Sequence, residues 1–129
     1  MHSAVLYRHL RTLRQCYTTG QFEALSMFLA EDCVFETQWV LAPRVSKLSV
    51  LAYLMRKGSL MRDSNSCPRG IIVEVQHPYR KLALLLRQRL NDKTHAALVD
   101  IQIDGEDKIS RIDVCMPQFF QYVPYFDKD

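Results

Sequence analysis

The chain has 129 residues, of which 48% are hydrophobic and 24% are charged, with a formal net charge of +3. These totals are typical of one globular domain, which we expect to span residues 1–129 with a core at 4–116 and a tail at 117–129. No apolar run approaches the roughly 18 residues of a membrane span, and three arginines interrupt the first apolar segment. The sequence therefore predicts a cytoplasmic protein without a membrane segment, and so mild a charge does not favour nucleic acid.

The cysteines do not form a recognisable metal or disulfide pattern. They occupy positions 16, 33, 67 and 115, without a Cys-x-x-Cys pair and without histidines at zinc-finger spacing. In a cytoplasmic protein such cysteines are expected to be free thiols. We therefore predict no metal site and no cofactor.

The first half of the chain reads as helices around one strand. Apolar residues recur at helical spacing over residues 4–17, which predicts a helix that Gly20 ends. A second helix is expected at about 21–30, followed by a strand at 33–40. A third helix is expected from its N-cap at Ser46 to Gly58, before a loop at 59–70.

The second half reads as four strands, expected near 71–77, 81–90, 95–103 and 108–116. The connections between them are short and contain turn residues, which predicts an antiparallel meander. The residues that flank each turn are expected to be cross-strand partners: Gln76 with Lys81, Leu90 with His95, and Ile103 with Lys108.

This register assigns the side chains to two faces. The inner face collects the apolar residues Ile71, Val73, Val75, Leu82, Leu84, Leu86, Leu90, Ala97, Val99, Ile101, Ile103, Ile112, Val114 and Met116. The outer face collects Glu74, Gln76, Arg87, Arg89, Asp100, Gln102, Arg111 and Asp113, with Asp100 directly opposite Arg111. Four strands thus agree on one core-facing side, as expected when one face of a sheet is buried.

Three stretches of sequence resemble the nuclear transport factor two-like superfamily. They are the helix–glycine–helix start at 17–25, the entry into the first strand at 29–36, and the start of the last strand at 108–112. The resemblance implies an α+β fold of three helices packed on a strongly curved, mostly antiparallel sheet that forms a cone. It covers roughly residues 4–116.

The superfamily includes ketosteroid isomerase, polyketide cyclases and transport-factor dimers, and the resemblance allows the catalytic positions of the isomerase to be compared. The isomerase's general-base aspartate aligns with Thr37. Its oxyanion-hole tyrosine and protonated aspartate align with Leu13 and Val99. None of these three side chains can perform the isomerase's acid–base chemistry, so steroid isomerisation is not expected.

The inner face predicts an apolar cavity with a few polar groups and no carboxylate. The candidate ligand-binding residues are Phe35, Thr37, Trp39, Tyr53, Gln88, His95, Val99 and Met116. We expect a small, largely apolar ligand that Thr37, Gln88 or His95 orients, without catalysis. One alternative is an isomerase-like or cyclase-like enzyme with His95 as acid or base. Another is an interaction module that needs no ligand.

Two surfaces suggest association. The outer face mixes charged residues with Leu85 and Leu98, which favours a homodimer through that face. The tail contains five aromatic residues, an unusual patch to leave in water. We expect the tail to pack on its own domain or on a partner subunit.

Overall fold

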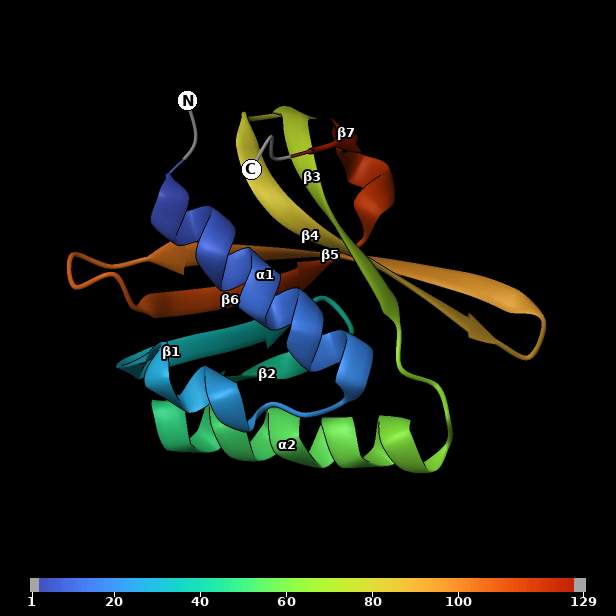
Figure 1. Cartoon of the computed structure of the whole chain (residues 1–129), viewed down its shortest axis with the longest axis horizontal. Coiled ribbons are helices and arrows are strands. Elements are labelled where there is room, and N and C mark those ends of the chain that lie inside the picture. The colour runs from blue at the N-terminus through green and yellow to red at the C-terminus, as the bar shows by residue number, and fades with distance from the viewer. Residues whose placement is uncertain (1–2, 127–129) are drawn as a thin grey trace.

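The computed structural model describes residues 3–126, except for the side chains of Val40 and Leu41. This part of the chain forms two α-helices, two short 3-10 helices and seven strands (Figure 1). Their bounds are α1 Ala4–Thr19, η1 Glu23–Met27, β1 Leu29–Thr37, β2 Val40–Val45, α2 Lys47–Asp63, β3 Arg69–His77, β4 Lys81–Leu90, β5 Lys93–Ile103, β6 Ile109–Cys115, η2 Pro117–Phe119 and β7 Gln121–Pro124. No helix within residues 3–126 is long and apolar enough to cross a membrane.

All seven strands form one sheet in the order β2-β1-β6-β5-β4-β3-β7. Strand β1 runs parallel to β6, and every other neighbouring pair is antiparallel. The four strands of the expected meander are confirmed as β3 to β6. The sheet curves, with α1 lying across it and α2 below (Figure 1). The α+β class with a curved sheet is therefore confirmed.

The prediction of three helices is wrong, because the segment at 21–30 contains only the short η1. Gly20 has a left-handed φ of 72° and caps α1, and Phe22 and Leu25 are then fully buried. Strand β1 already begins at Leu29, which pairs with Ile109 of β6. Pairing with a distant strand thus overrides the weak helical periodicity of this segment.

The helix expected to end at Gly58 continues as α2 to Asp63. A Cβ atom on Gly58 would lie only 2.3 Å from the carbonyl oxygen of Gly20 and 2.9 Å from the Phe22 ring. The glycine therefore marks a close contact between α2 and the turn after α1, and does not mark a helix end.

Strand β2, which contains Pro43, was not predicted from the sequence. Strand β2 pairs only with β1, so it forms one edge of the sheet. Proline is tolerated on an edge strand because the missing N–H leaves no internal hydrogen bond unmade. Trp39, which was placed inside the first strand, lies in the turn between β1 and β2.

The predicted register of β3 is wrong by one residue. Lys81 pairs with Val75 instead of Gln76, and Leu84 pairs with Ile72. Because side chains alternate between the faces of a sheet, this shift moves every residue of β3 to the opposite face. Ile72 consequently joins the core under the helices, and Val73 and Val75 join a second cluster on the outer face.

The pairing of β4 with β5 differs from the prediction by two residues, and so does that of β5 with β6 beyond an irregularity between Gln102 and Ile103. An even difference leaves the faces of these strands as predicted. Leu90 pairs with Lys93, and Val99 with Val114. The expected pair of Asp100 and Arg111 is nevertheless wrong, because Asp100 lies opposite Asp113. Arg111 lies opposite Gln102 instead.

Two apolar clusters lie on opposite sides of the sheet. The larger cluster fills the space between the helices and the sheet, and includes the fully buried Leu10, Leu13, Leu54, Val99, Ile101 and Ile112. The smaller cluster consists of Val73, Val75, Ala83, Leu85 and Leu98, with Phe120 and Tyr122 of the tail packed against it. Strand β7 pairs with β3, so the described tail packs on its own chain (Figure 1).

This tail changes the basis of the predicted homodimer. Leu85 and Leu98, which suggested an apolar interface, are each only 1% exposed. Glu74, also assigned to the outer face, shares the inner face with Leu82, its cross-strand partner. A dimer through the outer face stays a prediction, and it would have to use polar and charged residues for much of its contact.

Two core thiols should make the stability of the protein fall at alkaline pH. Burial is the main factor that raises the pKa of Cys16 and of Cys33 from 9.0 to about 11, with smaller effects from Glu23 and Asp32 respectively. Unfolding restores the ordinary pKa, so the unfolded chain loses these protons first and is favoured as pH rises. We expect each thiol to remove on the order of 2 kcal/mol of unfolding free energy at pH 11.

Urea denaturation at a series of pH values between 9 and 11 checks this expectation. The double variant Cys16→Ala, Cys33→Ala should lose less stability across that range than the unmodified chain. Cys67→Ala, at a half-buried position, is the control and should keep the original slope. Identical slopes for all three proteins would contradict a role for the buried thiols.

Candidate functional site

A pocket of about 340 Å³ lies between α2, the β1–β2 turn and the distal part of the β4–β5 hairpin. Its lining comes from α1, α2, four strands and two connections: Tyr17, Phe35, Thr37, Trp39, Tyr53, Lys57, Met61, Pro68, Leu86, Gln88, Leu90, His95, Ala96, Ala97 and Val114. The volume is at the lower end of the range for pockets that hold small molecules.

Aromatic side chains form the floor of the pocket and part of its rim. The rings of Phe35 and Tyr53 are 5.1 Å apart, and the guanidinium of Arg44 lies 5.1 Å from the Tyr53 ring centre. Tyr17 packs edge-on against Phe22 at 5.0 Å. Phe35 and Tyr17 are almost fully buried, whereas Trp39 at the mouth is 57% exposed. The pocket therefore has a fixed aromatic floor and a rim that faces solvent.

The structure places six of the eight predicted ligand-binding residues around this pocket. They are Phe35, Thr37, Trp39, Tyr53, Gln88 and His95. Val99 is fully buried in the core and does not line the pocket. Met116 lies beyond the end of β6, where its backbone N–H donates to Oε1 of Gln38 at 2.8 Å. These last two residues therefore do not line this pocket.

Sequence reasoning missed the contribution of α2 beyond Tyr53. Lys57 and Met61 follow Tyr53 at successive intervals of four residues, so the three side chains share one face of the helix. The spacing itself was visible in the sequence. It was overlooked because the helix was expected to end at Gly58.

The polar groups of the pocket differ in how far their hydrogen bonds are already satisfied. The Thr37 hydroxyl accepts from the Trp39 N–H at 3.3 Å, and the Gln88 side-chain amide donates to the Ser66 carbonyl. Lys57 and His95 have neither a hydrogen bond nor an ion pair with any residue of the described chain. These two are therefore the groups best able to contact the polar end of a ligand.

The electrostatic character of the pocket follows from its side chains. No acidic residue lines it within the described part of the chain. Burial, with smaller effects from Tyr53 and Cys16, raises the pKa of Tyr17 well above its ordinary value, so its hydroxyl stays protonated. Among the described residues, the pocket thus offers His95 no carboxylate to orient its imidazole. Over residues 3–126, no three His, Cys, Asp or Glu side chains are grouped in a way that could hold a metal ion.

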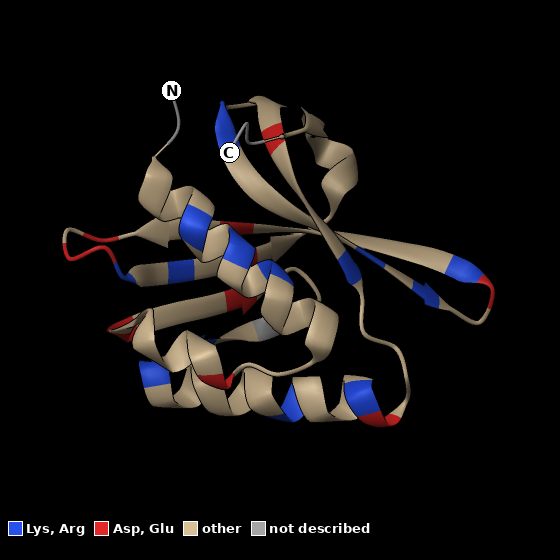
Figure 2. Cartoon of the chain, in the orientation of Figure 1, with Lys and Arg blue, Asp and Glu red and all other residues tan. Residues whose placement is uncertain are grey.

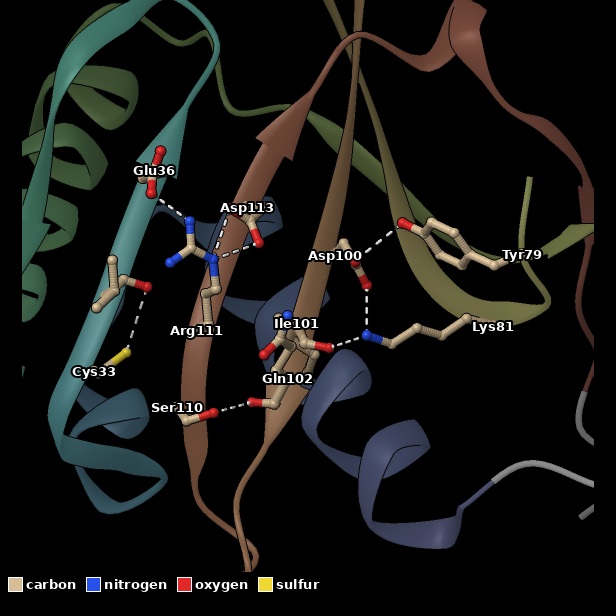
Figure 3. Close-up of polar contacts among 11 residues, drawn as sticks. Cys33, Glu36, Tyr79, Lys81, Asp100, Ile101, Gln102, Ser110, Arg111 and Asp113 are labelled. Carbon is tan, nitrogen blue, oxygen red and sulfur yellow. Dashed lines mark hydrogen bonds and ion pairs between the residues drawn. The ribbon is translucent and has the colours of Figure 1, made fainter. Parts of the chain in front are cut away.

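The acidic residues of the central strands lie on the other side of the sheet, where each has a cation (Figure 3). Arg111 pairs with Glu36 across the parallel strands and with Asp113 at 3.0 Å. Lys81 pairs with Asp100 at 2.9 Å, and the Tyr79 hydroxyl donates to the same carboxylate at 3.2 Å. Burial and Asp100 together raise the pKa of Tyr79 to about 12, so this donor is present at neutral pH. The carboxylates on this face are thus committed to ion pairs.

The sequence matches no protein-family profile and no curated protein. Solved structures with a similar architecture do exist. A designed protein with a curved β-sheet is 17% identical, with a TM-score of 0.65 over 92% of this chain and 91% of that one. An NTF2-like protein of unknown function from Mesorhizobium loti is 11% identical, with a TM-score of 0.65 over 92% and 93%.

A third similar structure is a steroid delta-isomerase from Pseudomonas aeruginosa. It is 14% identical, with a TM-score of 0.62 over 88% of this chain and 80% of that one. Identities this low establish a shared fold and leave activity open, because one fold supports many unrelated functions. The designed protein illustrates the same point, since its architecture was specified without descent from any enzyme.

Proposed function

We propose that this chain, whose fold is the nuclear transport factor two-like fold, binds a small, largely apolar molecule in its pocket without catalysing a reaction. The observation that carries the proposal is the lining of the pocket. It combines a preformed aromatic floor with few polar groups, which is typical of sites that bind and orient small molecules. It contains no carboxylate within the described residues to act as an acid or base.

The free polar groups also suggest the chemistry of the ligand. Lys57 and His95 both offer N–H donors, and the protonated hydroxyl of Tyr17 adds another at the buried end. A ligand with an apolar body and an acceptor group, such as a carbonyl or carboxylate, complements this arrangement. The Thr37 and Gln88 side chains are already engaged and would help to shape the site.

Trp39 allows the proposal to be tested directly, because it is the single tryptophan of the sequence and lies at the pocket mouth. We expect 1-anilinonaphthalene-8-sulfonate, an apolar molecule with an anionic group, to quench Trp39 fluorescence saturably. Ala97→Phe should fill part of the pocket and weaken the affinity by about tenfold or more, which corresponds to 1.4 kcal/mol.

Ala52→Phe is the matched control, since it adds the same side chain on the exposed face of α2. Both variants should keep the circular dichroism spectrum of the unmodified chain. Equal affinities for the two variants would show that the dye binds elsewhere and would overturn the proposal. In a separate measurement, native mass spectrometry of the protein as purified would identify any ligand carried from the cell.

A further inference from the structure

Three arginines, two of them in the distal part of the β4–β5 hairpin, form a separate positively charged surface. Arg69 of β3 pairs directly with Arg87 of β4, and Arg89 follows two residues later on the same face. Figure 2 shows basic segments at the start of β3 and along this hairpin, which projects beyond α2. The three side chains line a groove of about 530 Å³, together with Asn65, Ser66, Cys67, Ile71, Leu85, Gln88 and Thr94.

These arginines have no counter-charge in the described chain. Within residues 3–126, no acidic side chain lines the groove, and none forms an ion pair with Arg69, Arg87 or Arg89. The other end of the same face is different, because Arg111 and Lys81 are paired there with carboxylates (Figure 3). On this face of the described sheet, the arginines without an ion pair thus lie together at the hairpin end.

Arginines that face each other without a counter-charge lower the stability of the fold unless a bound anion compensates their repulsion. Side chains directly opposite on antiparallel strands have Cβ atoms about 5 Å apart, and like charges in these positions repel. Arg69 and Arg87 occupy such a pair. A bound anion would convert this repulsion into two attractive contacts.

We propose that the arginine groove binds the phosphate group of a small phosphorylated molecule. Guanidinium groups present paired N–H donors that match phosphate oxygens, and several arginines together favour a dianion over a single carboxylate. Asn65, Ser66 and Thr94 supply polar groups at the rim, and Ile71, which is 42% exposed, offers an apolar surface for the rest of the molecule. The groove is much larger than one phosphate, which leaves room for that remainder.

Pyrophosphate is the probe for the test, titrated into the full chain by calorimetry at low ionic strength and again with added sodium chloride. We expect saturable binding that weakens with salt, because exposed charges are screened. Arg87→Gln and Arg69→Gln should each weaken it by about tenfold or more. Arg56→Gln, an exposed arginine of α2 outside the groove, is the control and should bind normally.

A second measurement separates binding from folding. Without pyrophosphate, Arg87→Gln should melt about 2 °C higher than the unmodified chain, because it removes the repulsion of Arg69. With pyrophosphate the order should reverse. A variant that simply folds badly would melt lower under both conditions, and that result would contradict the proposal.

Two further outcomes would also overturn the proposal that the arginine groove binds phosphate. Binding only to vesicles that contain phosphoinositides, with no binding of pyrophosphate, would assign the arginines to a membrane surface. Sedimentation velocity that shows a dimer dissociated by Arg87→Gln, again without pyrophosphate binding, would assign them to a second copy of the chain. Ala97 lines the pocket and does not line the groove, so the Ala97→Phe variant should bind pyrophosphate normally.

Discussion

Replacing Gly58 by alanine is expected to lower the free energy of unfolding by about 3 kcal/mol or more. The added Cβ would lie 2.3 Å from the Gly20 carbonyl oxygen and 3.0 Å from the Gly20 carbonyl carbon. Both atoms belong to the backbone of the turn that caps α1, so rotation of a side chain cannot relieve the overlap. Helix α2 would have to move away from this turn, which would disturb the buried Phe22 between them.

Gly105→Ala is a matched control for this substitution. A Cβ at Gly105, in the β5–β6 turn, would meet no atom within 4 Å. This variant should be neutral or slightly stabilising, since alanine restricts the unfolded chain more than glycine does. Urea denaturation of both variants measures the difference. A Gly58→Ala protein as stable as Gly105→Ala would mean that α2 and the α1 turn do not make this contact.

Shortening the chain so that it ends at Met116 should cost about 3 kcal/mol or more and make the protein self-associate. The missing segment contains Phe120 and Tyr122, which pack on the outer-face cluster. It also contains β7, which hydrogen-bonds to β3. Its loss would expose apolar side chains and an unpaired strand edge together, a combination that favours aggregation.

Two single substitutions test the same point in the full chain. Phe120→Ala should destabilise the protein by about 2 kcal/mol, because this ring packs on the cluster. Its neighbour Phe119 is 63% exposed, so Phe119→Ala should change stability little. Urea denaturation gives the stabilities and light scattering gives the masses. A shortened chain with the same state of association and the same stability as the full chain would show that the tail does not cover the sheet.

The strands β3 to β6 could be predicted because turn residues mark each connection, but the register of β3 could not. Apolar residues occupy both alternations of this strand, since Ile72 and Val73 are adjacent and both buried. One of them faces the helices and the other faces the tail. The sequence pattern therefore did not distinguish the two faces, and a difference of one residue in the turn decided between them.

Six of the residues predicted to bind a ligand line one pocket for the opposite reason. The error at the β4–β5 turn was two residues, so Gln88 and His95 kept their inward face. The helical wall was predicted less well, because Gly58 has two possible meanings in a sequence. It can end a helix or allow a close approach, and only the three-dimensional contact with Gly20 shows which applies.

The parallel pairing of β1 with β6 has a consequence for the order in which the molecule assembles. Phe35 pairs with Ile112, and β2 is attached to the sheet only through β1. During synthesis, the β1–β2 hairpin therefore emerges long before the strand that receives it, while β3, β4 and β5 can pair with one another as they appear. Contacts between such distant segments slow folding, since a long loop must close before they form. The edge of β1 therefore has no hydrogen-bonding partner until β6 has been synthesised. In that interval the nascent chain is most vulnerable to association with other chains.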